Sequence, residues 1–289
     1  MRAFRRALVH ASILAALTIA ATAARAETLV ERGRYLMNSV VACGNCHTPR
    51  GPDGALVAGR ELAGGMEFAE EPFTARAPNI TPDRETGIGA WTDAQLARAI
   101  REGVRPDGTV IGPPMPFQFY RGIADADLRA IIAYLRQVPP VRNAVARSEY
   151  RMPLPPNWGP PVGRVRAPSR DNAARYGAYL AGPLGHCMDC HTPLTPTGRD
   201  MTRAGAGGQP FNGPWGVSVA RNITPHDTGL RGWSDAEIAR AIREGVSRDG
   251  SRLKPPMGFD FYRNISPRDM RALVAYLRSL PPQPLASAR

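Results

Sequence analysis

The sequence predicts an all-α chain made of two tandem copies of one domain, joined by a proline-rich linker. The first observation is a long internal repeat, in which Trp-Thr-Asp-Ala-Gln-Leu-Ala-Arg-Ala-Ile-Arg-Glu-Gly-Val at 91–104 returns as Trp-Ser-Asp-Ala-Glu-Ile-Ala-Arg-Ala-Ile-Arg-Glu-Gly-Val at 233–246. Pro-Pro-Met at 113–115 returns at 255–257, and the offset between the copies stays near 142–144 residues. A solenoid would need shorter units and at least three of them. The second observation is that helix-capping residues begin the periodic segments of both copies, whereas strand signals are weak and short.

The first segment of the chain, residues 1–26, has the features of a secretory signal peptide. A start with three arginines is followed by an apolar stretch at 11–24, and Ala-Arg-Ala at 24–26 forms a cleavage site before Glu27. The alternative is an uncleaved membrane anchor, but the apolar run is shorter than the roughly 20 residues that a spanning helix needs. We therefore expect an exported, periplasmic protein with no transmembrane segment after signal cleavage.

The repeat and a change of composition divide the remaining chain into three parts. We expect a first domain at 27–140, a linker at 141–170 and a second domain at 171–289. The linker is rich in proline, arginine and glycine, as in Met-Pro-Leu-Pro-Pro-Asn-Trp-Gly-Pro-Pro at 152–161. Segments of this kind are extended and stiff. The linker is therefore either a simple spacer or an ordered strap that packs on both domains.

Each copy is predicted to contain helices between Gly- and Pro-rich loops. Thr-x-x-Gln at 92–95 and Ser-x-x-Glu at 234–237 form capping boxes, in which side chains satisfy the free N–H groups of a helix start. Gly103 and Gly245 are expected to end these helices. The last helix of each copy carries an apolar stripe, at Leu128, Ile131, Ile132 and Leu135 in the first copy and at Met270, Leu273, Val274 and Leu277 in the second.

The strongest chemical signal is Cys-x-x-Cys-His, which occurs at 43–47 and again at 187–191. This pentapeptide attaches c-type haem, because two thiols at this spacing form thioether bonds to one porphyrin and the adjacent histidine binds its iron. A zinc site, a thioredoxin-like redox pair and a short disulfide do not explain a histidine directly after both pairs. The four cysteines are the only ones in the chain. We therefore expect two covalently bound haem c groups.

The candidate haem residues follow from the two motifs and from one further repeat. Pro-Pro-Met lies at the same position in both copies, 68 and 66 residues after the motif histidine, in a proline-stiffened loop suited to holding a soft ligand. A buried methionine that merely fills a gap is the plainer alternative. The unpaired His186 and His226 are weaker ligand candidates. The expected covalent attachment residues are Cys43, Cys46, Cys187 and Cys190, and the expected axial ligands of iron are His47, Met115, His191 and Met257.

Together these motifs resemble the class I c-type cytochromes, in particular the multihaem cytochrome c subunits of bacterial periplasmic dehydrogenases. The resemblance covers nearly the whole mature chain. It implies an all-α fold of two tandem class I cytochrome c domains, with first and last helices that cross, and Met115 and Met257 as distal ligands. Members commonly carry three such domains and associate with the membrane, whereas this sequence predicts two domains and no C-terminal anchor. The motifs that wrap the haem in such proteins contain Asn79, Trp91, Asn222 and Trp233.

These inferences predict a periplasmic dihaem cytochrome c that transfers electrons and is not itself an enzyme. Its expected donor is a periplasmic dehydrogenase, and its expected acceptor is another cytochrome or an oxidase. The alternatives are a dihaem peroxidase or oxidase and, further off, a haem-based sensor. Without the four signal-peptide arginines the chain keeps 33 basic against 25 acidic side chains, a net charge of +8. This excess either keeps the protein soluble or steers it to an acidic partner; no basic cluster suggests nucleic acid.

Overall fold

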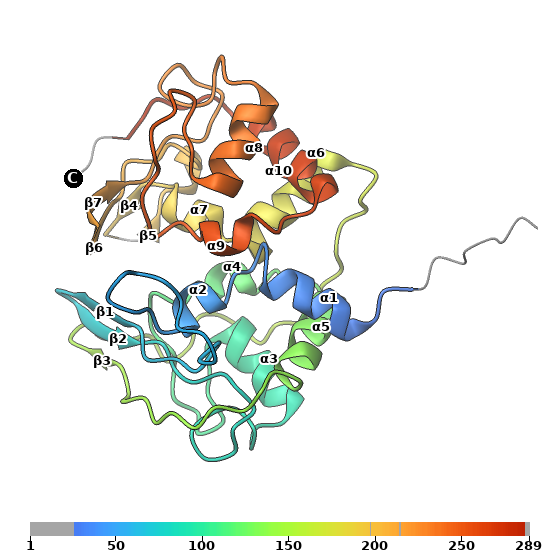
Figure 1. The fold of residues 1–289 in the computed structure, drawn as a ribbon, viewed down its shortest axis with the longest axis vertical. Coiled ribbons are helices and arrows are strands. Elements are labelled where there is room, and N and C mark those ends of the chain that lie inside the picture. Colours follow the sequence, from blue (N-terminus) through green and yellow to red (C-terminus); the bar gives the residue numbers. More distant parts are fainter. Residues whose placement is uncertain (1–25, 197, 214, 287–289) are drawn as a thin grey trace, which may run out of the picture.

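The computed structural model describes residues 26–196, 198–213 and 215–286 (Figure 1). The predicted signal peptide therefore lies, apart from Ala26, outside the described residues. Within the described ranges, no helix has both the length and the apolar character needed to cross a membrane.

The helices follow the same order in the two halves of the chain. Those of the first half are α1 (Leu29–Met37), α2 (Gly44–His47), α3 (Asp93–Glu102), α4 (Phe117–Tyr120) and α5 (Asp125–Leu135). Those of the second half are α6 (Ala173–Tyr179), the π-helix η1 (Leu180–Leu184), α7 (Cys187–Cys190), the 3-10 helix η2 (Met201–Arg203), α8 (Asp235–Glu244), α9 (Phe259–Tyr262) and α10 (Pro267–Ser279).

Helices α3 and α8 begin and end where the sequence predicts. Thr92 Oγ1 accepts the Gln95 N–H at 3.2 Å, and the Ser234 hydroxyl accepts the Glu237 N–H at the same distance. Both capping boxes are complete. Each helix ends at a glycine in the left-handed region, with a φ of 64° at Gly103. These capping predictions are confirmed.

The first and last helices of each half cross in close contact. Helix α1 packs on α5, and α6 packs on α10. A Cβ atom on Gly33 would lie 1.9 Å from the carbonyl oxygen of Ala130, and one on Gly177 would lie 1.9 Å from that of Ala272. Only glycine permits this backbone approach. Around each crossing lies the buried core, which includes both predicted stripes: Leu128, Ile131, Ile132 and Leu135 in α5, and Met270, Leu273, Val274 and Leu277 in α10.

The prediction of an all-α fold is wrong. Of the residues that the structure describes, 32% are helical and 11% lie in strands or bridges. The strands form three small antiparallel sheets, with the orders β1-β2-β3, β4-β5 and β6-β7. Their bounds are β1 (Glu67–Glu70), β2 (Phe73–Arg76), β3 (Glu149–Tyr150), β4 (Leu194–Thr195), β5 (Gly198–Arg199), β6 (Pro210–Gly213) and β7 (Gly216–Val219). Strands of two to four residues are too short to show the alternating apolar pattern that predicts a strand. They form because neighbouring loop segments satisfy their backbone N–H and C=O groups by pairing with each other.

The segment expected as a linker is ordered against the first half. Strand β3 pairs with β2, and the Trp158 indole N–H donates to the Ile111 carbonyl at 2.9 Å. The Trp158 ring packs on Phe117 with 4.5 Å between ring centroids. Further along, the Asp125 N–H donates to the carbonyl of Val165 at 3.0 Å. The contacts named here hold the segment on the first half rather than leave it as a free spacer.

The two halves also touch through a reciprocal pair of hydrogen bonds. Tyr35 Oη in α1 donates to Asp269 in α10 at 2.7 Å, and Tyr179 Oη in α6 donates to Asp127 in α5 at 2.8 Å. The two tyrosines occupy equivalent positions in the repeat, and so do the two aspartates. The halves are therefore related by an approximate two-fold axis at this contact, and Figure 1 shows the two sets of helices facing each other there.

Candidate haem sites

Each Cys-x-x-Cys-His motif folds into a single helical turn. In the first half Cys43 is the N-cap residue of α2 and His47 is its last residue; in the second, Cys187 begins α7 and His191 follows its end. Residues three and four apart on a helix lie on one face. Each turn therefore presents two thiols and one imidazole on the same side.

All four motif cysteines are half-buried, and no disulfide joins any two of them. Burial raises the thiol pKa to about 12 for Cys43 and Cys190 and to about 11 for Cys46 and Cys187. The thiols are therefore protonated at neutral pH. They are not paired as disulfides, so all four remain available for thioether bonds.

The two motif histidines are held in one defined tautomer. His47 Nδ1 lies 2.9 Å from the Pro78 carbonyl oxygen, and His191 Nδ1 lies 2.7 Å from that of Arg221. Because a carbonyl only accepts, Nδ1 carries the proton in each ring and Nε2 keeps its lone pair. Burial lowers the pKa of both histidines, which favours the neutral ring. An oriented, neutral imidazole with a free Nε2 suits binding to iron.

The carbonyl groups that hold these histidines are themselves fixed by a buried asparagine. Asn79 follows Pro78 directly; its Oδ1 accepts from the N–H and hydroxyl of Thr81 at 2.9 and 2.8 Å, and its Nδ2 donates to the Val141 carbonyl at 2.7 Å. The side chain is 3% exposed. Asn79 thereby ties the loop beside His47 to the chain that leaves α5.

The second half repeats this arrangement. Asn222, also 3% exposed, accepts from both groups of Thr224 and donates to the Gln283 carbonyl at 2.6 Å. Asn79 and Asn222 therefore support the histidines through the backbone. Both asparagines were expected in haem-wrapping motifs, but the histidine-binding carbonyls of Pro78 and Arg221 were not predicted. The Asn-Ile-Thr-Pro repeat directly after each of them was the available signal.

The candidate methionines lie in matching loops. Both are half-buried, and both follow a cis Pro-Pro bond. The carbonyl of Met115 accepts the Phe117 N–H, and that of Met257 accepts the Phe259 N–H, each at 3.0 Å. The pairing of each methionine with the histidine of its own half stays a prediction. The competing His186 packs edge-on against Tyr120 with 5.7 Å between ring centroids, and His226 interacts with the Thr228 hydroxyl at 3.0 Å.

The apolar surroundings of the turns are repeated as well. The half-buried apolar side chains that pack against the core include residues at equivalent positions of the two halves, namely Cys43, Ile80 and Trp91 in the first and Cys187, Ile223 and Trp233 in the second. Such side chains suit a large, flat, apolar ligand that is held along one edge. Paired thiols, an oriented imidazole and this apolar lining fit a haem. They place the chain in the class of proteins that bind haem covalently.

Comparison with known proteins supports the same conclusion, that the chain binds haem covalently. The family model for cytochrome c matches residues 30–139. A diheme cytochrome c-type protein of Cereibacter sphaeroides is 33% identical over 252 residues, which cover 83% of this chain and 82% of that protein. The chain belongs to the cytochrome c family, whose members carry haem c attached to the protein.

Other relatives are named as parts of dehydrogenases. The cytochrome c subunit of the quinone alcohol dehydrogenase of Gluconobacter oxydans is 31% identical over 281 residues, which cover 89% of this chain and 56% of that subunit. A nicotinate dehydrogenase subunit of Pseudomonas putida is 33% identical over 90% of this chain but only 22% of its own length. The chain thus spans about half or less of these two relatives. Relatives named as cytochrome subunits confirm, at the level of the family, the expectation of an electron carrier rather than an enzyme.

Proposed function

We propose that this protein is a periplasmic dihaem cytochrome c that passes electrons from a dehydrogenase to a downstream cytochrome or oxidase. The observation that carries the proposal is the duplication of one complete site. Each half has a turn with two cysteines outside any disulfide and an imidazole whose Nδ1 is held by a backbone carbonyl, at 2.9 Å for His47 and 2.7 Å for His191. The likeness of the two sites favours two electron-carrying haems over the unlike pair of a dihaem peroxidase.

The residues take the following roles in this proposal. The two cysteines of each motif would hold the porphyrin, the histidine would bind iron through Nε2, and Met115 or Met257 would supply the second protein ligand. Bound haem supplies one-electron redox chemistry, and histidine–methionine ligation sets a high potential. Asn79 and Asn222 keep the imidazoles in place, so that little rearrangement accompanies the gain or loss of an electron.

The proposal includes the location of the protein and its electron donor. The periplasmic location rests on the signal peptide predicted at 1–26. The donor rests on the relatives, whose names include dehydrogenases of nicotinate, alcohol, gluconate and fructose. The net charge of +8 expected after signal cleavage favours a donor or acceptor with an acidic docking surface.

Two measurements on the purified holoprotein test the proposal. The reduced protein is mixed with carbon monoxide; methionine-ligated haems resist this ligand, whereas a peroxidase or gas sensor binds it readily. The oxidised protein is then added to periplasmic fractions supplied with nicotinate, an alcohol, gluconate or fructose in turn. We expect no carbon monoxide spectrum and substrate-dependent reduction by one fraction. Rapid carbon monoxide binding by either haem would contradict the carrier function.

A further inference from the structure

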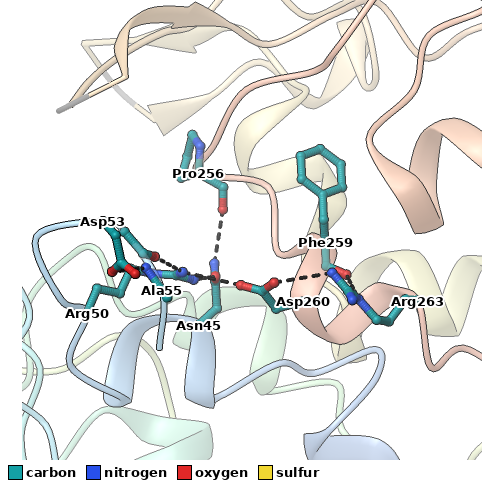
Figure 2. A network of polar contacts seen from close by, with 9 residues as sticks. Asn45, Arg50, Asp53, Ala55, Pro256, Phe259, Asp260 and Arg263 are labelled. Atoms are coloured by element: carbon teal, nitrogen blue, oxygen red, sulfur yellow. Dashed lines mark hydrogen bonds and ion pairs between the residues drawn. The ribbon is translucent and has the colours of Figure 1, made fainter. Parts of the chain in front are cut away.

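The first haem turn makes close contacts with the second half, on both sides of the candidate ligand Met257. Asn45, inside the first Cys-x-x-Cys-His motif, donates from Nδ2 to the Pro256 carbonyl at 3.0 Å. Arg50 Nη1 forms an ion pair with Asp260 at 3.2 Å. Pro256 directly precedes Met257, and Asp260 lies three residues after it. Figure 2 shows these two contacts side by side, with Asn45 and Arg50 on the first half facing Pro256 and Asp260 on the second.

Arg50 also orients the asparagine that makes the first contact. Its Nη2 donates to Asn45 Oδ1 at 2.8 Å, which leaves the Asn45 amide N–H₂ directed at the Pro256 carbonyl. The Arg50 side chain is 23% exposed, so it is partly shielded from solvent. Asn45 and Arg50 therefore act as one unit that holds the segment 256–260, here called the Met257 segment, at both of its ends.

A contact between the corresponding segments, made by different atoms, exists in the other direction. Asp189, at the position of Asn45 in the second motif, accepts from Gln118 Nε2 at 3.3 Å. Gln118 lies three residues after Met115 and occupies the repeat position of Asp260. Arg199 binds Asp189 at 3.2 Å, as Arg50 binds Asn45, although the two arginines do not occupy equivalent positions in the repeat. The contact between a haem turn and the methionine segment of the other half is thus made twice.

Backbone packing at the first contact is tight. A Cβ atom on Gly44 would lie 2.7 Å from the Phe261 ring in α9. A Cβ atom on Gly258, next to Met257, would lie 3.4 Å from the Asn45 side chain. The Gly44 backbone therefore lies directly against the Phe261 ring, Gly258 lies within ordinary van der Waals reach of Asn45, and the polar contacts oppose movement of residues 256–260 away from the first half.

We propose that each haem turn braces the axial-methionine segment of the other half, with Asn45 and Arg50 acting as positioning residues for Met257. The inference rests on the proposed ligation of haem by Met257. Its consequence is that the second haem depends on the first half for the strength of its methionine bond. Loss of the brace lets Met257 leave iron more often, so the second haem drops in potential and accepts outside ligands more easily.

The test compares Arg50→Gln and Asp260→Asn with a matched control in the holoprotein. Arg263→Gln is the control, because Arg263 contacts Asp260 at 3.4 Å but belongs to the same half. Imidazole is the probe ligand. In the proton NMR spectrum of the reduced protein, the haem ring current shifts the methyl signal of a methionine that binds iron. Loss of one such signal in Met115→Ala or Met257→Ala assigns it to one of the two haems. Because partly exposed ion pairs are weak, we expect imidazole affinity at the second haem to rise about threefold in Asp260→Asn. A larger rise of about five- to tenfold is expected in Arg50→Gln, which also loses the hydrogen bond to Asn45.

The outcomes separate this inference from the proposed function. A selective change at the second haem that is absent in Arg263→Gln supports the brace. Equal changes at both haems, or none, overturn it while the dihaem carrier stands. If Met257→Ala leaves both methyl signals in place, Met257 is not a ligand, and the brace falls together with that ligand assignment. All variants lie outside the attachment cysteines and histidines, so haem loading by mass reports whether each protein has matured.

Discussion

Replacement of Asn79 by alanine is expected to destabilise the first half selectively and to loosen His47. The asparagine makes four hydrogen bonds of 2.7 to 3.1 Å, two through Oδ1 to Thr81 and two through Nδ2, to the Val141 carbonyl and to Thr86 Oγ1. At about 1 kcal/mol net for each bond, the loss is about 4 kcal/mol. This is a large part of the stability of a domain of this size, which is about 5–15 kcal/mol.

The assay is denaturant unfolding of the holoprotein, followed by tryptophan fluorescence and by the haem absorption of the oxidised form. Asn79→Ala should split the transition in two, with the first half unfolding at lower denaturant and the potential of one haem shifted because the Pro78 carbonyl no longer fixes His47. Asn222→Ala is the matched control and should do the same to the other half. A loss below about 1 kcal/mol in both variants would refute the view that these asparagines hold the histidine-binding loops.

Three further outcomes follow from the structure. Gly33→Ala should lower the unfolding temperature by many degrees, because its Cβ would lie 1.9 Å from the Ala130 carbonyl, whereas Gly163→Ala, with nothing within 4 Å, should leave it unchanged in the same thermal scan. Met115→Ala and Met257→Ala should each lower one of the two potentials measured by spectroelectrochemistry and keep haem content at two; unchanged potentials would show that the ligands lie elsewhere. Reduction by the donor should slow as salt is raised, because the expected net charge of +8 is screened, and a rate independent of ionic strength would argue against electrostatic steering.

The sequence predicted α3, α8 and the last helix of each half because the signals of these helices are local. A capping box and a terminal glycine lie within one segment, and Thr92 with Gly103 bounds α3 as expected. The glycines at the helix crossings, Gly33 and Gly177, begin a Gly-x-Tyr-Leu pattern that occurs at 33–36 and again at 177–180. Their reason, a carbonyl of a distant helix at the Cβ position, depends on tertiary packing that no local pattern encodes.

Neither the sheets nor the groups that support the histidines could be predicted from the sequence. Strand β3 pairs with β2 from more than 70 residues away, so the all-α prediction missed a contact set by the path of the linker. The motif cysteines and histidines indicate their chemistry by spacing alone. The supporting groups are backbone carbonyls, at Pro78 and Arg221, and any residue type supplies a carbonyl. The contact of Asn45 with Pro256 likewise joins residues far apart in the chain.

The most direct test of the central claim is to map haem onto the purified, exported protein by mass. Intact mass should exceed that of the cleaved chain by two haems, and peptide mapping should place one on Cys43 and Cys46 and the other on Cys187 and Cys190. A reductive titration of the same sample should consume two electrons per chain. One haem, none, or a motif peptide with free thiols would contradict the account of two equivalent electron-carrying sites.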